Sequence, residues 1–149
     1  MKMEFHGFGH VSLVVSDFDA SLAFYDKVMR HLGMKEYVER HPFFHGWFAG
    51  EYMFVIMHAA QAGDRFSQFR TGLHHLSFRA TSREEVDAFG AMLERIGAKI
   101  IRRPELGSFW PGYYSVLCED PDGIRIEMNY IPEEGWNAVD AASDAIARK

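Results

Sequence analysis

Three side chains of the kinds that bind metal ions stand at related positions in this 149-residue chain. His10 and His75 each begin a segment with the composition of a β-strand, at matching positions of two similar stretches, and Glu127 interrupts an apolar run at 124–128. Two neutral imidazoles and one carboxylate leave coordination positions open for water or substrate, as in catalytic metal sites. The sequence therefore predicts that His10, His75 and Glu127 hold one divalent ion, for which iron, manganese, nickel, cobalt and zinc are all suitable.

Each of these residues also has a purely structural interpretation. A histidine at the start of a strand is more often a hydrogen-bonded structural residue than a metal ligand. Glu127 could form a salt bridge with Arg79 or Arg125. We expect His74 to face solvent or to support its neighbour, because His75 and not His74 keeps the register of the repeat.

Further candidates surround this predicted triad. His58 ends the strand that corresponds to the one bearing Glu127, so it is a candidate fourth ligand or general base, although alternation could instead turn Met57 or Val55 inward. Aromatic residues are numerous, and they could line an apolar pocket around the metal or simply fill the core. The predicted substrate pocket consists of Phe44, Trp47, Trp110 and Tyr113.

An internal repeat positions these side chains. Residues 7–16, Gly-Phe-Gly-His-Val-Ser-Leu-Val-Val-Ser, are echoed by residues 72–81, Gly-Leu-His-His-Leu-Ser-Phe-Arg-Ala-Thr. Each copy begins with a predicted strand, at 10–15 and at 75–80, and continues into an amphipathic helix. Asp17 or Asp19 can cap the first helix and Ser82 the second, and Gly33 and Gly97 close them.

Three extended segments follow each helix, at 35–40, 46–48 and 52–58 and again at 99–103, 113–119 and 124–131. The turn Asp120-Pro121-Asp122-Gly123 predicts an antiparallel hairpin between the last two strands. Period two places Arg125, Glu127 and Asn129 on one face of the final strand. We expect an α+β fold of two tandem βαβββ modules in one domain, at about 5–60 and 70–131, with a loop and short helix in the tail, 132–149.

The composition excludes several classes of partner. The net charge is −5, from 16 basic and 21 acidic residues, and no basic patch suggests nucleic acid or an anionic membrane. We expect Arg102 and Arg103 to lie at a solvent-exposed end of a strand. The single cysteine, Cys118, excludes an internal disulfide and fits a reducing compartment. No signal sequence and no apolar run near the roughly 20 residues of a membrane span is present, so we expect a soluble, unprocessed, cytoplasmic protein.

The two histidine strands and the segment Asp-Pro-Asp-Gly-Ile-Arg-Ile-Glu at 120–127 together resemble the vicinal oxygen chelate superfamily, which includes glyoxalase I, extradiol dioxygenases and bleomycin resistance proteins. The resemblance covers about residues 5 to 131. It implies paired βαβββ modules whose mixed sheets curl around a divalent metal, and isomerase, lyase or dioxygenase chemistry on a small vicinally oxygenated metabolite. Members commonly dimerise, so a homodimer is expected.

The sequence departs from glyoxalase I at one point, because it has no glutamate or glutamine ligand on the strand at 52–58. The remaining His-His-Glu set resembles the extradiol dioxygenase and fosfomycin-modifying pattern. Extradiol enzymes place a further histidine and tyrosine beside the metal, and His58 with Tyr113 or Tyr114 are the candidates here. The alternative function is that of a bleomycin-resistance-like protein, which sequesters an aromatic small molecule without a metal.

Overall fold

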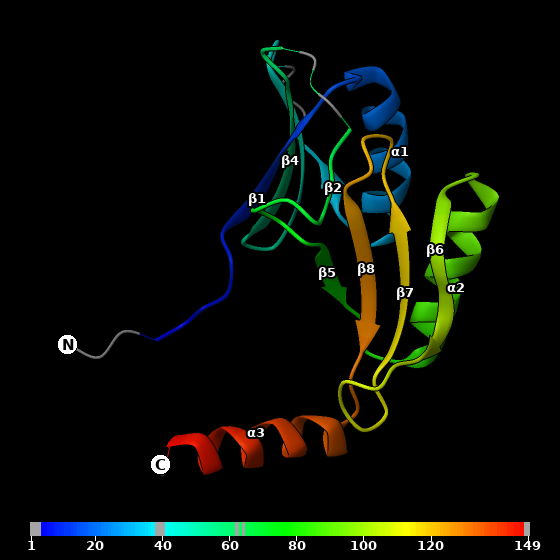
Figure 1. Ribbon diagram of the computed structural model, residues 1–149. Coiled ribbons are helices and arrows are strands. Elements are labelled where there is room, and N and C mark those ends of the chain that lie inside the picture. The colour runs from blue at the N-terminus through cyan, green and yellow to red at the C-terminus, as the bar shows by residue number, and fades with distance from the viewer. Residues whose placement is uncertain (1–3, 38–40, 62, 64, 148–149) are drawn as a thin grey trace. The chain divides into compact units, whose positions relative to one another are not determined.

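The computed structural model describes residues 4–37, 41–61, 63 and 65–147 (Figure 1). The chain forms two compact units, Met1–Arg65 and Phe66–Lys149. The boundary falls in the linker that the repeat leaves between its two modules. Within the described part of the chain, no helix is long and apolar enough to cross a membrane.

Both units have the same strand order and the same strand directions. The first sheet has the order β1-β4-β3-β2 and the second the order β5-β8-β7-β6. The first strand of each unit pairs in parallel with the last, and the other neighbours pair antiparallel. The first unit contains β1 His10–Val15, α1 Phe18–His31, β2 Lys35–Glu36, β3 Phe44–Ala49 and β4 Tyr52–His58. The second contains β5 Leu76–Arg79, α2 Arg83–Arg95, β6 Lys99–Leu106, β7 Tyr114–Glu119, β8 Arg125–Tyr130 and α3 Glu133–Ala147.

The predicted tandem βαβββ modules are thus confirmed, although several boundaries differ. The strand predicted at 46–48 is longer, as β3 Phe44–Ala49, and the one predicted at 99–103 continues to Leu106. β5 begins at Leu76, so His75 directly precedes the strand. β2 has two residues, while 38–40 of the predicted strand 35–40 lie outside the described residues. The tail forms a fifteen-residue helix rather than a short one.

The helices α1 and α2 each begin at a side-chain cap. Asp17 accepts a hydrogen bond from the Ala20 amide at 3.0 Å, and Ser82 accepts one from the Glu85 amide at 3.3 Å. The Glu85 carboxylate turns back to accept from the amide of Thr81 at 2.7 Å. These contacts satisfy amide groups that have no partner within the first turn of a helix.

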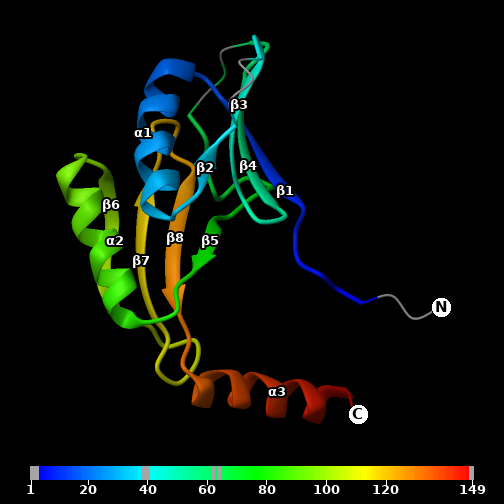
Figure 2. The same cartoon turned by 180° about the vertical axis from the view of Figure 1, so that it is seen from behind.

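In the first unit α1 covers one face of the sheet, and in the second unit α2 does so (Figure 1; Figure 2). We call this the covered face of each sheet and the opposite one the open face. Residues that alternate along a strand point to opposite faces, so every second residue is packed beneath the helix. In the first sheet Leu13, Val15, Phe54 and Ile56 are buried in this way. In the second, the predicted packed set at 124, 126 and 128 is buried as expected. The predicted site residues at 10 and 127 therefore lie on open faces.

Candidate functional site

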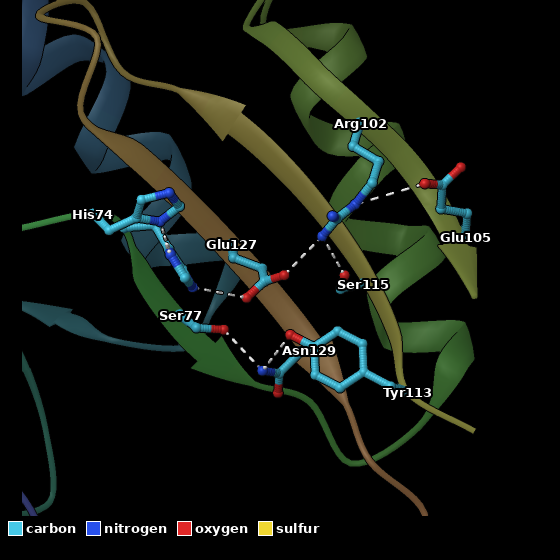
Figure 3. Close-up of polar contacts among 9 residues, drawn as sticks. His74, Ser77, Arg102, Glu105, Tyr113, Ser115, Glu127 and Asn129 are labelled. Carbon is cyan, nitrogen blue, oxygen red and sulfur yellow. Dashed lines mark hydrogen bonds and ion pairs between the residues drawn. The ribbon is translucent and has the colours of Figure 1, made fainter. Parts of the chain in front are cut away.

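The open face of the second sheet carries a polar network centred on Glu127, which is only 4% exposed (Figure 3). Its Oε1 accepts a hydrogen bond from Arg102 Nη2 at 2.8 Å, and its Oε2 lies 3.3 Å from His75 Nε2. The same guanidinium nitrogen donates to Ser115 Oγ at 2.7 Å. A buried carboxylate requires such partners, because desolvation of an unpaired charge is unfavourable.

Glu127 forms a salt bridge, as its structural interpretation allowed, but with Arg102 rather than with Arg79 or Arg125. The register explains this choice, because Arg102 on β6 pairs with Leu117 on β7, which pairs with Glu127 on β8. All three side chains thus point to the same face, and a long arginine reaches across the central strand. The expectation of a solvated strand end at Arg102 was wrong.

A second set of contacts lies beside the carboxylate. Asn129 Nδ2 donates to Ser77 Oγ at 3.0 Å and to the Tyr113 hydroxyl at 3.2 Å. Burial raises the pKa of Tyr113, the hydrogen bond from Asn129 lowers it, and the negative charge of Glu127 raises it further, with a net upward shift. The Tyr113 phenol is therefore held in its neutral, proton-donating form.

His74 contacts the predicted ligand His75 through its ring. The two Nδ1 atoms lie 2.7 Å apart, so one ring donates a proton to the other. An ion bound at His75 Nε2 would leave the proton on Nδ1, and this N–H would donate the hydrogen bond to His74 Nδ1. This contact matches the supporting role expected for His74.

The network forms one wall of a pocket of about 340 Å³. Two of the predicted pocket residues, Trp110 and Tyr113, line it together with Phe109. Arg102 and Arg125 add positive charge to the same pocket. Period-two alternation had placed Arg125, Glu127 and Asn129 on one face, and their shared contacts confirm it.

Two of the predicted site residues, His10 and His58, lie on opposite faces of the first sheet. His10 alternates with buried Leu13 and Val15, which places it on the open face. His58 stacks on Phe18 of α1, with ring centroids 3.8 Å apart and an 8° angle, and so lies on the covered face. The structure therefore does not bring His58 and His10 together.

Other predicted residues lie outside the pocket. Trp47 is fully buried in the first unit, where its Nε1 donates to Asp26 at 3.2 Å, so its ring belongs to the core. Phe44 stands on the open face of β3, opposite Met57. The Tyr114 hydroxyl donates to Asp87 of α2 at 2.8 Å, on the covered side.

Sequence reasoning gave no site role to Arg102, Arg125 or Phe109. For Arg125 a signal was present, because alternation placed it beside Glu127. For Arg102 the same alternation was available along residues 99–106, but the strand's place next to β7 was not known. Phe109 lies in a loop, where no periodicity applies.

The second unit supplies two donors that fit a single metal ion. Ligand atoms roughly 2.1 Å from an ion, at tetrahedral or octahedral angles, stand about 3.0–3.4 Å from each other. The 3.3 Å between His75 Nε2 and Glu127 Oε2 falls in this range. Within the described ranges no three His, Cys, Asp or Glu side chains already form a metal-binding cluster, and His10 belongs to the other unit.

Comparison with known proteins points to one family. A sequence profile described as the Glyoxalase/Bleomycin resistance protein/Dioxygenase superfamily matches residues 7–128. The Bacillus subtilis protein YqjT is 34% identical over 124 residues, which are 80% of this chain and 94% of YqjT. A solved structure from Bacillus halodurans matches with 32% identity and a TM-score of 0.74, over 85% of this chain and 96% of the other. A glyoxylase/bleomycin resistance protein/dioxygenase domain from Frankia sp. EAN1pec matches with 28% identity and a TM-score of 0.70, over 87% and 100%.

Proposed function

Because this chain belongs to the glyoxalase/bleomycin resistance protein/dioxygenase superfamily, we propose that it is a divalent-metal-dependent enzyme acting on a small vicinally oxygenated metabolite, as an isomerase, lyase or dioxygenase. The observation that carries this proposal is the convergence of His75 Nε2 and Glu127 Oε2, 3.3 Å apart, in the wall of a pocket of about 340 Å³. A pocket with a few convergent polar groups is the usual form of a small-molecule site.

The residues around this pair have distinct proposed roles. His75 and Glu127 are the two proposed ligands that the second unit supplies. Arg102, which also donates to Ser115, holds the carboxylate in place, and His74 orients the imidazole. A bound iron, manganese, nickel, cobalt or zinc ion would supply Lewis acidity toward the substrate oxygens.

Tyr113 is the proposed proton donor to the substrate. Its hydroxyl lies on the open face beside Asn129, and its raised pKa keeps it protonated at neutral pH. The earlier candidates, His58 and Tyr114, contact helices on the covered faces instead. A neutral phenol beside the pocket can donate a hydrogen bond to an oxygen that gains charge during reaction.

A binding protein without a metal is the second candidate, and one observation favours it. One oxygen of Glu127 already accepts a hydrogen bond from Arg102, and aromatic side chains line the same pocket. A metal-free pocket of this kind would retain an aromatic molecule by stacking. Metal content distinguishes the two candidates.

We also expect the protein to work in the cytoplasm, as a homodimer, with a small molecule as its main partner. The expectation of a reducing compartment rests on the use of a single cysteine, Cys118, which is buried. Sedimentation at several protein concentrations tests the dimer, and a monomer at all of them would contradict it.

The deciding experiment is elemental analysis of protein purified without chelator or affinity tag. We expect near-stoichiometric metal in the wild type, its loss in His75→Ala, and its retention in His58→Ala, which removes an imidazole from a covered face. Iron would direct assays to dioxygenation, and nickel, cobalt or zinc to isomerisation. Unchanged metal content in His75→Ala, or no metal after reconstitution of the wild type, would favour the binding protein.

A further inference from the structure

We propose that the pocket of the second unit selects a carboxylate attached to a flat apolar body, and that Arg125 binds the anionic group. This inference deepens the function proposed above and rests on it for the catalytic use of the pocket. Binding of the anion itself requires no metal.

The two arginines that line the pocket differ in their ion-pair partners. Arg102 is balanced by Glu127, at 2.8 Å, and also lies 3.8 Å from Glu105. Arg125 has no ion pair or hydrogen bond with any residue in the described part of the chain, and its buried Nε has no acceptor. Glu119, which stands opposite Arg125 in the β7–β8 ladder, pairs with Lys99 at 2.9 Å. Among the residues that the structure describes, the positive charge of Arg125 therefore has no ion-pair partner.

An unpaired cation in a partly buried site is stabilised when an anion binds beside it. The Arg125 guanidinium lies over the ring of Phe69, 6.0 Å from its centroid, which is a cation–π contact. An arginine fork matches the two oxygens of a carboxylate, and the resulting charge-assisted hydrogen bonds are about twice as strong as neutral ones. Arg125 is therefore suited to a carboxylate rather than to a neutral group.

Aromatic side chains line the same pocket as Arg125. They come from the loop at 107–113, where the Gly107 amide donates to the Tyr113 carbonyl at 2.8 Å. Phe109 packs edge-on against Tyr113, with centroids 5.5 Å apart, and Trp110 remains 37% exposed. A methyl group at Gly107 would lie 2.8 Å from the Tyr113 ring, so glycine permits this packing. These rings form a wall for a flat apolar molecule, and about 340 Å³ suits a small one.

The anion site adjoins the predicted metal ligands. Leu76 pairs with Ile126 in the parallel β5–β8 ladder, so the preceding residues, His75 and Arg125, stand side by side at the ends of the strands. Both line the pocket. A carboxylate bound by Arg125 would thus present an oxygen on the neighbouring carbon toward the His75–Glu127 pair.

Calorimetric titration of chelator-treated, full-length protein tests the proposal. The probes are benzoate and salicylate, with benzamide and salicylamide as neutral counterparts of the same shape. We expect each carboxylate to bind at least about tenfold more tightly than its amide. Arg125→Gln should weaken benzoate binding about tenfold and leave benzamide binding unchanged. The matched control is Arg103→Gln, which removes an exposed arginine that pairs with Glu94 of α2, and should bind benzoate as the wild type does.

Equal affinity of the wild type for carboxylate and amide, or absence of benzoate binding, would overturn the proposal without any variant. Undiminished benzoate binding by a folded Arg125→Gln protein, checked by circular dichroism, would overturn it as well. The two proposals fail separately. Carboxylate selectivity in a protein that never takes up metal would support the anion site and contradict the enzyme, whereas metal uptake without selectivity would do the reverse.

Discussion

The open faces of the two sheets differ, although the sheets have one topology. Ser12 pairs with Val55 in the first unit, and Ser77 pairs with Glu127 in the second. The two serines match in the repeat, so Val55 is the structural counterpart of Glu127. This equivalence agrees with the expectation that the strand at 52–58 lacks a carboxylate ligand.

The contrast extends along the last strand of each unit. Met53 and Met57 of β4 stand where β8 has Arg125 and Asn129. The first open face therefore offers His10 among apolar side chains, whereas the second offers a histidine, a carboxylate and two arginines. The modules have kept the same fold and the same first histidine, while polar chemistry is concentrated in one of them.

The largest expected effect comes from removing the centre of the polar face. Glu127→Ala leaves Arg102 partly buried without its carboxylate, so we expect the free energy of unfolding to fall by about 3 kcal/mol and bound metal to be lost. Glu127→Gln keeps an acceptor oxygen and should lose less stability. Urea denaturation and metal analysis measure both effects, and unchanged stability in Glu127→Ala would show that the network does not support the fold.

The reciprocal change places a carboxylate on the apolar face. Val55 is 7% exposed, so Val55→Glu buries a charge that has no arginine nearby in the register. We expect the free energy of unfolding to fall by about 2 kcal/mol, because the carboxylate loses hydration without a partner. Val55→Thr, which keeps the shape, is the control and should lose less. A Val55→Glu protein as stable as the wild type would mean that the two faces tolerate charge equally.

On the covered sides the units should behave alike. Asp17→Ala and Ser82→Ala each remove a helix cap and should each lower the free energy of unfolding by about 1 kcal/mol. The caps lie in different units and share no partner, so the double variant should show the sum. Thermal or urea unfolding measures all three variants. Clearly different losses of stability in the two single variants would show that the covered sides of the two units are not equivalent.

The smallest expected effect concerns Tyr113 and appears only at high pH. Its pKa is raised in the folded protein, chiefly by burial, so its contribution to stability is present below the ordinary tyrosine pKa of about 10 and is lost as pH rises through the folded value. We expect Tyr113→Phe to lose less stability than the wild type above pH 10 or so. Urea denaturation at several alkaline pH values checks this, and identical pH dependence in both proteins would contradict the shift.

Local patterns allowed much of the fold to be predicted. The strands at 10–15 and 52–58 have the predicted bounds, because apolar content and flanking turn residues act within a few positions. In the turn after β7 the Gly123 amide donates to the Asp120 carbonyl at 3.1 Å, and Gly123 has a φ of +91°, as the Pro-Asp-Gly sequence indicated.

The residues of the site were harder to predict than the fold, because a side chain belongs to the site only if it lies on the open face of its sheet. Tyr113 and Tyr114 are adjacent, so alternation sends their side chains to opposite faces of the sheet. The sequence does not say which face each one takes. In the structure Tyr114 contacts α2 on the covered face, and Tyr113 lines the pocket. His58 raised the same question, and its stacking on Phe18 answers it.

The sequence by itself determined the repeat, the βαβββ order and the helix caps, since these follow from local spacing and from likeness between two segments. Only the tertiary structure decided that Arg102 holds Glu127, that Arg125 lines the pocket with no acceptor for its Nε among the described residues, and that Trp47 fills a core. These outcomes depend on the lateral order of strands and on which face a helix covers. Such contacts join residues far apart in the chain, and no local pattern encodes them.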